Sequence, residues 1–411
     1  MSRIYTFHKT VIGNLHIKNG IICEDYSASF SAENNRYHIA IVADGHGSRS
    51  CFRSAFGAKK VTEVAFDCLQ ELAETVLASE DEENRFYKEK FLNHRDRKTT
   101  LRQLTDTIIA RWHNCVLEDY ESTPPSLEEM GEFAAEYQNG ENVSHIYGTT
   151  VIAALWLPMY LILLQQGDGR CDVFYENSTV NQPIPWDSRC EDTVTTSMCD
   201  DDVMDSFRTH VVDLSAEPVI ACYLGTDGVE DAYRDTYEAL GGCHVLMGGV
   251  HTFYKDLTCE IAARDAKDFE AYLDIMLPEF SALGRFSRCG SGDDVSVAGI
   301  VDIEAVSKIA ENFRLDVRQY DLEESLFWKE DELRGKTRKY GILQKRMKDA
   351  EEDLENCKNR NEKIHELEEI YADASKAFQE YDVKYKSIEA EKKRIEDEIE
   401  VLLKSAGAQN K

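Results

Sequence analysis

Basic residues are scarce in this 411-residue chain: 47 Lys and Arg stand against 77 Asp and Glu, a formal net charge of −30. A chain without surplus positive charge cannot neutralise many phosphates, which excludes non-specific nucleic-acid binding. The same shortage disfavours an anionic membrane surface as a partner. Hydrophobic residues still make up 42% of the chain, so wholesale disorder is also excluded.

Long apolar runs are missing as well. The first ten residues, MSRIYTFHKT, lack the apolar core of a secretory signal. The longest apolar run, 151–164, contains Pro158 and is too short to cross a bilayer, so it predicts two buried strands joined by a turn. The 12 cysteines include no Cys-x-x-Cys pair, which excludes zinc-ribbon spacing and favours reduced thiols in a cytoplasmic protein.

The composition changes near residue 302. Beyond it proline is absent, glycine is rare, and Glu, Lys, Arg and Leu dominate. Residues 303–411 hold 22 basic and 27 acidic residues, a net charge of −5, so the other −25 belongs to residues 1–302. We therefore expect two domains, 1–302 and a helical tail over 303–411.

The tail has a heptad-like pattern. Between 343 and 402 apolar residues recur in alternating steps of three and four, typical of a coiled-coil seam. Two interpretations stay open: a coil that pairs with a second copy or a helical partner, or a hairpin that folds back on its own chain. Ile364 to Leu367 repeats a step of three, which marks a break or bend. A homodimer predicts that light scattering finds the full chain self-associated and a 1–302 fragment monomeric.

A polar stretch over about 76–145 interrupts the first domain. Within it, apolar residues at helical spacing predict a core-facing helix: Leu101, Leu104, Ile108, Ile109, Trp112 and Val116. The stretch Thr123–Ser126 contains two prolines and predicts a loop. We interpret 76–145 as a helical insertion.

Five short segments could carry chemistry, because each places acidic residues on or beside a glycine-containing turn. In chain order they are Cys23-Glu24-Asp25, Asp44-Gly45-His46-Gly47, Gly148-Thr149-Thr150 with Gly167-Asp168-Gly169-Arg170, Thr226-Asp227-Gly228-Val229-Glu230-Asp231, and Gly292-Asp293-Asp294. Each alone is typical of an ordinary turn.

Together the five segments predict a metal site. Several carboxylates aimed at one point repel one another unless divalent cations lie between them, and oxygen ligands select Mg²⁺ or Mn²⁺. Two such ions lower the pKa of a shared water and direct it at phosphorus. A neighbouring histidine can protonate the leaving oxygen.

In their order and residue identities the segments resemble those of the metal-dependent protein phosphatase family, type 2C, over residues 1–302. The Gly13-Asn-Leu-His16 opening is most similar to the bacterial branch. The resemblance implies an α+β fold, with a central β-sandwich of two antiparallel sheets flanked by helices. Here a helical, coiled-coil tail would follow it. The resemblance also implies an acidic flap over about 170–218.

The resemblance assigns direct metal ligands. Asp44 matches the carboxylate that bridges two Mn²⁺ or Mg²⁺ ions, and Gly45 matches the residue that offers its carbonyl to the second ion. Asp227 and Asp293 match the remaining ligands of the first ion.

The resemblance also assigns acidic residues that surround the direct metal ligands. Glu24 and Asp25 match the acidic pair that holds metal-bound waters. Asp168 and Asp231 match a third, weaker metal position shared with Asp227. The site is therefore expected to hold two or three ions.

His46 matches the family's proposed general acid, but two positions depart from the pattern. Many members carry a phosphate-binding Arg where this chain has Gly20, so the candidate substitutes are His16, Lys18 or a residue distant in sequence. Asp294 replaces the Asn that commonly follows the last metal ligand.

The activity implied is hydrolysis of phosphoserine or phosphothreonine in a signalling phosphoprotein. A metal-bridging hydroxide would attack phosphorus without a phosphoenzyme. The acidic residues over 187–205 leave two interpretations open: a solvated acidic surface, or a preference for phosphosites flanked by Lys or Arg. Two other classes stay open: a phosphatase-like scaffold or regulator that acts through its coiled coil, and a two-metal hydrolase of a small phosphate ester.

Overall fold

The computed structural model describes residues 3–33, 35–78, 93–137, 142–190, 194–233, 237–240, 243–283, 291–358 and 364–409. The chain divides into two compact units, Met1–Arg314 and Leu315–Lys411. They are called here the sandwich unit and the tail unit.

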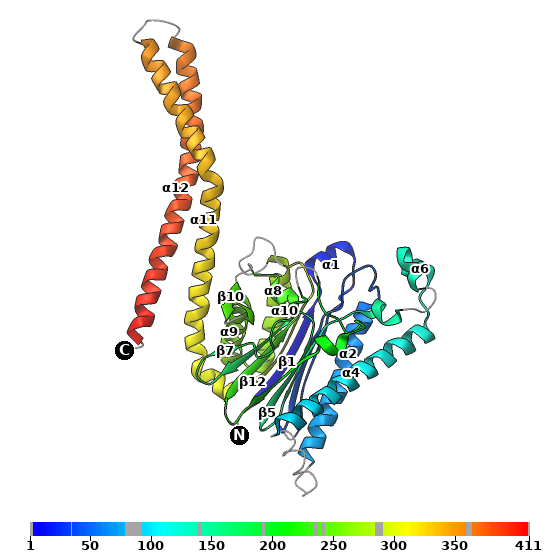
Figure 1. Ribbon diagram of the computed structural model, residues 1–411. Coiled ribbons are helices and arrows are strands. Elements are labelled where there is room, and N and C mark those ends of the chain that lie inside the picture. The colour runs from blue at the N-terminus through cyan, green and yellow to red at the C-terminus, as the bar shows by residue number, and fades with distance from the viewer. Residues whose placement is uncertain are drawn as a thin grey trace. The chain divides into compact units, whose positions relative to one another are not determined.

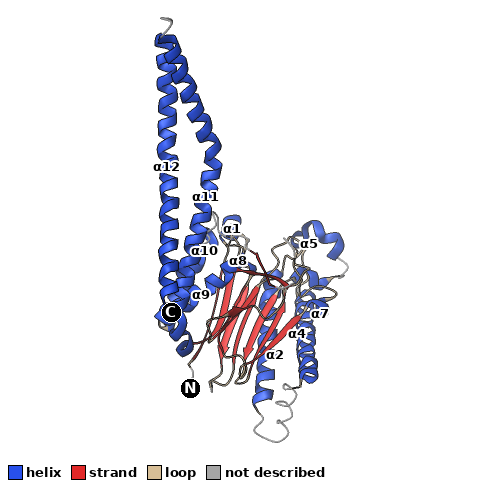
Figure 2. Cartoon of the chain, turned by 60° about the vertical axis from the view of Figure 1, so that its left-hand side comes forward, coloured by secondary structure: helices blue, strands red, loops and turns tan. Residues whose placement is uncertain are grey.

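The sandwich unit consists of two five-stranded antiparallel sheets that pack face to face (Figure 2), which confirms the predicted fold class. The first sheet has the order β1 (Ile4–Val11), β12 (Val295–Asp302), β9 (Val219–Gly225), β6 (Arg170–Tyr175) and β7 (Val180–Asn181). The second has the order β2 (Tyr26–Ser31), β3 (His38–Ala43), β4 (Val151–Trp156), β5 (Tyr160–Gln166) and β8 (Arg208–Asp213). A separate pair joins β10 (Tyr237–Leu240) and β11 (Cys243–Met247).

The run 151–164 forms two neighbouring strands, as predicted. Strands β4 and β5 are buried along their whole length because both faces of their sheet are covered. One set of side chains faces the other sheet, where Ile152 and Leu163 pack in one cluster with Cys222 and Ile300. The alternate set faces the helices.

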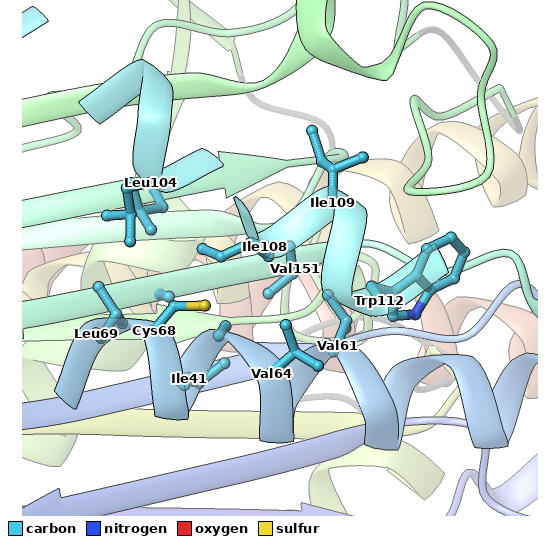
Figure 3. Close-up of a cluster of buried hydrophobic side chains, with 14 of the residues drawn as sticks. Ile41, Val61, Val64, Cys68, Leu69, Leu104, Ile108, Ile109, Trp112 and Val151 are labelled. Carbon is cyan, nitrogen blue, oxygen red and sulfur yellow. The ribbon is translucent and has the colours of Figure 1, made fainter. Parts of the chain in front are cut away.

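Helices α2 (Ser54–Leu77) and α4 (His94–Ser122) cover the outer face of the second sheet. Figure 3 shows Ile41 and Val151 of the sheet beside Val64 of α2 and Ile108 of α4. The predicted stripe from Leu101 to Val116 is at most 8% exposed, so its core-facing orientation is confirmed.

Helices α9 (Gly248–Ala263) and α10 (Ala266–Leu283) lie on the other side, against the first sheet. Aromatic pairs join these layers: Phe7 of β1 meets Phe269 of α10 with ring centroids 5.1 Å apart. The shorter helices are α1 (Asn14–Asn19), α5 (Leu127–Met130), η1 (Gly131–Phe133), α6 (Ala134–Tyr137), η2 (Val143–Tyr147), α7 (Val203–Ser206) and α8 (Asp227–Glu230).

The flap in the structure is shorter than the predicted range of 170–218. Strands β6 and β8 fall in that range, but they belong to the two sheets because their apolar residues fill the sandwich. The part outside the sheets runs from 182 to 207, is described over 182–190 and 194–207, and contains α7. In it, Arg189 pairs with Asp187 at 2.9 Å.

The tail unit consists of α11 (Ile303–Lys358) from Leu315 onward and α12 (Ile364–Gln409). The two helices run antiparallel (Figure 1): Lys329 pairs with Glu391 at 2.6 Å, and Tyr340 stacks on Tyr385 at 4.3 Å. The structure thus shows the hairpin interpretation, and α12 begins at Ile364, the first residue of the predicted break. Asn361, a seam position in the sequence, lies outside the described residues.

The predicted seam is the buried side of this hairpin. Ala350, Leu354, Ala374, Ile388 and Ile395 are 4–8% exposed. Pairing with a second copy or a helical partner through 343–402 stays a prediction. Among the described helices of both units, none is long and apolar enough to span a membrane.

Candidate metal centre

The acidic segments meet at one end of the sandwich. Antiparallel pairing puts the ends of β3, β5 and β9 beside the starts of β2, β4 and β12: Tyr26 pairs with Ala43, and Val151 pairs with Gln166. In the first sheet, Val297 pairs with Gly225. The carboxylates that follow or precede these strands are therefore gathered by the topology itself.

Asp44 is held through its backbone by the Gly-Thr-Thr segment. Its N–H donates to Thr150 Oγ1 at 3.1 Å, and its carbonyl accepts from the Thr150 N–H and the Thr149 hydroxyl, both at 2.8 Å. These bonds fix the backbone and leave the side-chain oxygens of Asp44 available.

Gly45 fills a place that no larger residue can take. It forms an isolated bridge with Thr149, and a Cβ added to it would lie 2.6 Å from the carbonyl oxygen of Glu24. The glycine thus lets the first and second acidic segments approach each other closely.

Five aspartates form two clusters that share Asp227, the first residue of α8. In each cluster one oxygen from every member lies within 4.8 Å of the others, and the members are Asp44, Asp168 and Asp227 in one and Asp227, Asp231 and Asp293 in the other. The resemblance grouped Asp293 with Asp44, and Asp231 with Asp168. The clusters place Asp168 beside Asp44 and Asp231 beside Asp293, and the charge of Asp293 also reaches Asp44.

These carboxylates are difficult to ionise together. Burial, and then the charge of neighbouring aspartates, raises the pKa of Asp44 and of Asp227 well above the usual range. Burial also raises the pKa of Asp168 and of Asp293. The Asp168 Oδ1 is buried without a hydrogen-bond partner among the described residues. An all-oxygen set with an unsatisfied buried oxygen fits a hard divalent cation.

Glu24 and Asp25 lie beside these clusters and belong to neither. Asp25 is 6% exposed and accepts a hydrogen bond from the Thr226 hydroxyl at 2.9 Å. Burial, and then the charge of Asp294, raises the pKa of Asp25 to about 8. Glu24 accepts from the Ser54 hydroxyl, and burial raises its pKa. Their role in holding metal-bound waters stays a prediction.

His46 is neutral at physiological pH. Burial, and then the charge of His145, lowers the pKa of His46 to about 4. Its ring lies against Gly148, where an added Cβ would come within 2.7 Å of the His46 Cδ2. A neutral imidazole must take up a proton before it can donate one, so its role as a general acid stays a prediction.

Of the two phosphate-binding candidates, the structure brings His16 to the site. His16 Nε2 lies 3.7 Å from Asp293 Oδ1, and its Nδ1 lies 3.0 Å from Asp294 Oδ1. Lys18 is exposed two residues further on.

Asp294 has a role that the sequence analysis missed. It is 3% exposed, and its two oxygens accept the backbone N–H groups of Gly13 and Glu24, each at 2.6 Å. It therefore joins the last acidic segment to the first. No local pattern indicates this, because the partners lie 281 and 270 residues away.

Arg170 was also missed as a positioning residue. Its guanidinium bonds both oxygens of Glu230, one at 2.6 Å, and lies over the Trp186 ring at 3.9 Å. Since Glu230 is in the same short helix as Asp227, the pair ties β6 to that helix.

The sandwich and its two aspartate clusters define a fold with a candidate divalent-cation site at one end. The chain belongs to the protein phosphatase 2C family, whose family model matches residues 12–258.

Several solved structures are similar to this chain at low identity. A bacterial serine phosphatase is 14% identical, with 73% of this chain and 98% of that chain covered and a TM-score of 0.42. Stp1, a serine/threonine phosphatase from Staphylococcus aureus, is 15% identical, with 73% and 95% covered and a TM-score of 0.40. The catalytic domain of PstP, in complex with two manganese ions, is 14% identical, with 72% and 97% covered and a TM-score of 0.39. No curated protein matches.

Proposed function

We propose that this chain is a Mn²⁺- or Mg²⁺-dependent phosphatase that removes phosphate from serine or threonine side chains of proteins. Water attacks phosphorus directly, and no phosphoenzyme forms. The observation that carries the proposal is the pair of aspartate clusters joined at Asp227, in a chain of the protein phosphatase 2C family.

The cations would be held by the clustered carboxylates, Asp44, Asp168, Asp227, Asp231 and Asp293, with the Gly45 carbonyl and the Glu24–Asp25 pair beside them. When bound, divalent ions supply a water of lowered pKa and neutralise charge on the phosphate.

The protein groups have separate tasks in this proposal. Asp294 and the Gly-Thr-Thr segment hold the ligand-bearing backbone in place. His16 lies where it can contact a phosphate near Asp293. His46 would carry the proton for the leaving oxygen, taken up on the approach of the negatively charged substrate.

The first test is hydrolysis of p-nitrophenyl phosphate by the purified full chain. We expect turnover with Mn²⁺, none with EDTA, and recovery when Mn²⁺ is returned in excess. Turnover that is insensitive to EDTA would contradict the proposed site.

Two alternatives are separated by further measurements. A phosphatase-like scaffold would bind Mn²⁺ in calorimetry without turnover. A hydrolase of small phosphate esters would prefer a nucleotide or sugar phosphate to phosphopeptides in kcat/KM. The intact aspartate clusters favour turnover over the scaffold. A cytoplasmic location and a role in signalling are part of the same proposal.

A further inference from the structure

Four aliphatic side chains are exposed on α1 and just after it, beside the candidate metal centre: Leu15, Ile17, Ile21 and Ile22. They are called here the α1 patch. These side chains are 50, 60, 42 and 68% exposed. Single exposed apolar residues are ordinary. The described residues include 16 exposed large hydrophobic side chains, and four of these fall within the eight consecutive positions 15–22. Clustered exposed apolar side chains mark interaction sites.

The patch is held in a defined position relative to the metal centre. The Leu15 N–H donates to the Gly292 carbonyl at 2.8 Å, next to Asp293. The Asn14 N–H donates to Ser281 Oγ at 3.1 Å, and this hydroxyl donates to the Asp293 carbonyl at 2.9 Å. Helix α1 is therefore hydrogen-bonded to the loop that carries a predicted metal ligand.

The patch is close enough to contact a substrate bound at the metal centre. His16 lies between Leu15 and Ile17, and its Nε2 is 3.7 Å from Asp293 Oδ1. An extended peptide advances about 3.3 Å per residue. A side chain one to three positions from a phosphorylated residue therefore reaches the patch while the phosphate is at the metals.

The size and charge of the patch favour a peptide as its occupant. Stable dimers bury roughly 800 Å² on each partner, which is more than four side chains supply. A nucleic acid or an anionic membrane is disfavoured by the net charge of −25 on residues 1–302. A single apolar side chain of a peptide fits a patch of this size.

We infer that the α1 patch binds an aliphatic or aromatic side chain that flanks the phosphorylated serine or threonine of the substrate. The inference rests on the proposed function and deepens it by naming a substrate feature. It makes Ile17 and Ile22, the most exposed members, specificity-determining residues.

The test compares two phosphopeptides that differ only beside the phosphoserine, one with leucines and one with serines, and uses p-nitrophenyl phosphate as the reference substrate. With the full chain and Mn²⁺, kcat/KM for the leucine peptide should exceed that for the serine peptide about tenfold, the effect of burying one aliphatic side chain. The double variant Ile17→Ser/Ile22→Ser should reduce this preference to within twofold. The control Ile275→Ser, at a position 65% exposed on α10, should retain it.

Each other outcome counts against the patch as a substrate site. Equal kcat/KM for the two peptides with the parent chain overturns the inference, and so does a preference that survives in the double variant. A double variant that loses peptide and p-nitrophenyl phosphate turnover in equal proportion shows a structural role instead. If the double variant changes only the mass in light scattering, a second copy or a partner occupies the patch. Failure of the proposed function is distinct, because the parent chain would then not hydrolyse p-nitrophenyl phosphate with Mn²⁺.

Discussion

Asp294 holds Glu24 in place: its Oδ2 accepts the backbone N–H of Glu24 at 2.6 Å across 270 residues of sequence. The other oxygen accepts the Gly13 N–H at the same distance. One buried side chain thus connects the start of the sandwich unit to its last acidic segment. The candidate metal ligands are aligned by hydrogen bonds as well as by strand pairing.

Asp294→Asn should therefore destabilise the sandwich unit. An amide offers one acceptor oxygen, so one of the two buried N–H groups loses its partner, at a cost of about 1–3 kcal/mol. Denaturant unfolding in EDTA measures the change. Asp201→Asn, at an exposed position, is the control and should stay within about 0.5 kcal/mol of the parent. Equal stability of the two variants would contradict the role given to Asp294.

Asp227→Asn should abolish most of the turnover, because Asp227 belongs to both aspartate clusters. Loss of a ligand shared by two cations removes several kcal/mol of transition-state stabilisation, so kcat on p-nitrophenyl phosphate should fall at least about a hundredfold. Calorimetry should show weaker Mn²⁺ binding by the same variant. If Asp227→Asn keeps more than a tenth of the parental kcat, the clusters are not the metal centre.

Much of the site could be predicted from local sequence, because four of the five acidic segments combine a buried strand with a glycine turn. Asp44 follows a six-residue buried strand, and the pattern alone places it at a strand end. The hydrogen bonds from the Gly13 and Glu24 N–H groups to Asp294 could not be predicted. Backbone partners this far away in the sequence leave no periodic pattern. The exposure of Ile17 and Ile22 could not be predicted for a different reason. The helix that holds Ile17, α1, has only six residues and is too short for a hydrophobic period to show which side is buried, and Ile22 follows it in a segment without regular structure.

In the tail, the heptad pattern predicted which face of the helices is buried but not which helix packs against that face. Steps of three and four predict which face of a helix is buried, and Ile388 and Ile395 are buried as predicted. The same steps suit a second chain or a hairpin equally well. The choice depends on whether the chain can reverse near the break, which only the folded structure reveals.

The benefit of Mn²⁺ to stability should increase with pH. Because the folded-state pKa values of Asp44, Asp227 and Asp25 are raised, with Asp25 at about 8, the folded apo chain holds protons there more tightly than the unfolded chain. That stability is present below the unfolded pKa near 4 and is lost as the pH rises through the folded values. Cations remove the repulsion. The Tm difference between Mn²⁺ and EDTA samples should therefore be larger at about pH 8 than at about pH 5.5. A constant or reversed difference would contradict the electrostatic account.

Ile388→Asp should open the tail hairpin, because Ile388 is 7% exposed on the buried seam and burying an unpaired carboxylate costs several kcal/mol. Limited proteolysis of the full chain should cut within α12 at least about tenfold faster. Val383→Asp is the matched control on the same helix, since Val383 is 69% exposed. Equal cleavage rates for the two variants would mean that the seam does not hold the hairpin together.

The most direct test of the central claim measures Mn²⁺ occupancy and phosphate release on the same sample of full chain, with a phosphoserine peptide and a nucleotide as competing substrates. The account predicts that release from the peptide rises with Mn²⁺ occupancy, stops in EDTA, and exceeds release from the nucleotide in kcat/KM. Mn²⁺ binding without any phosphate release, or peptide hydrolysis that persists without divalent cations, would contradict it.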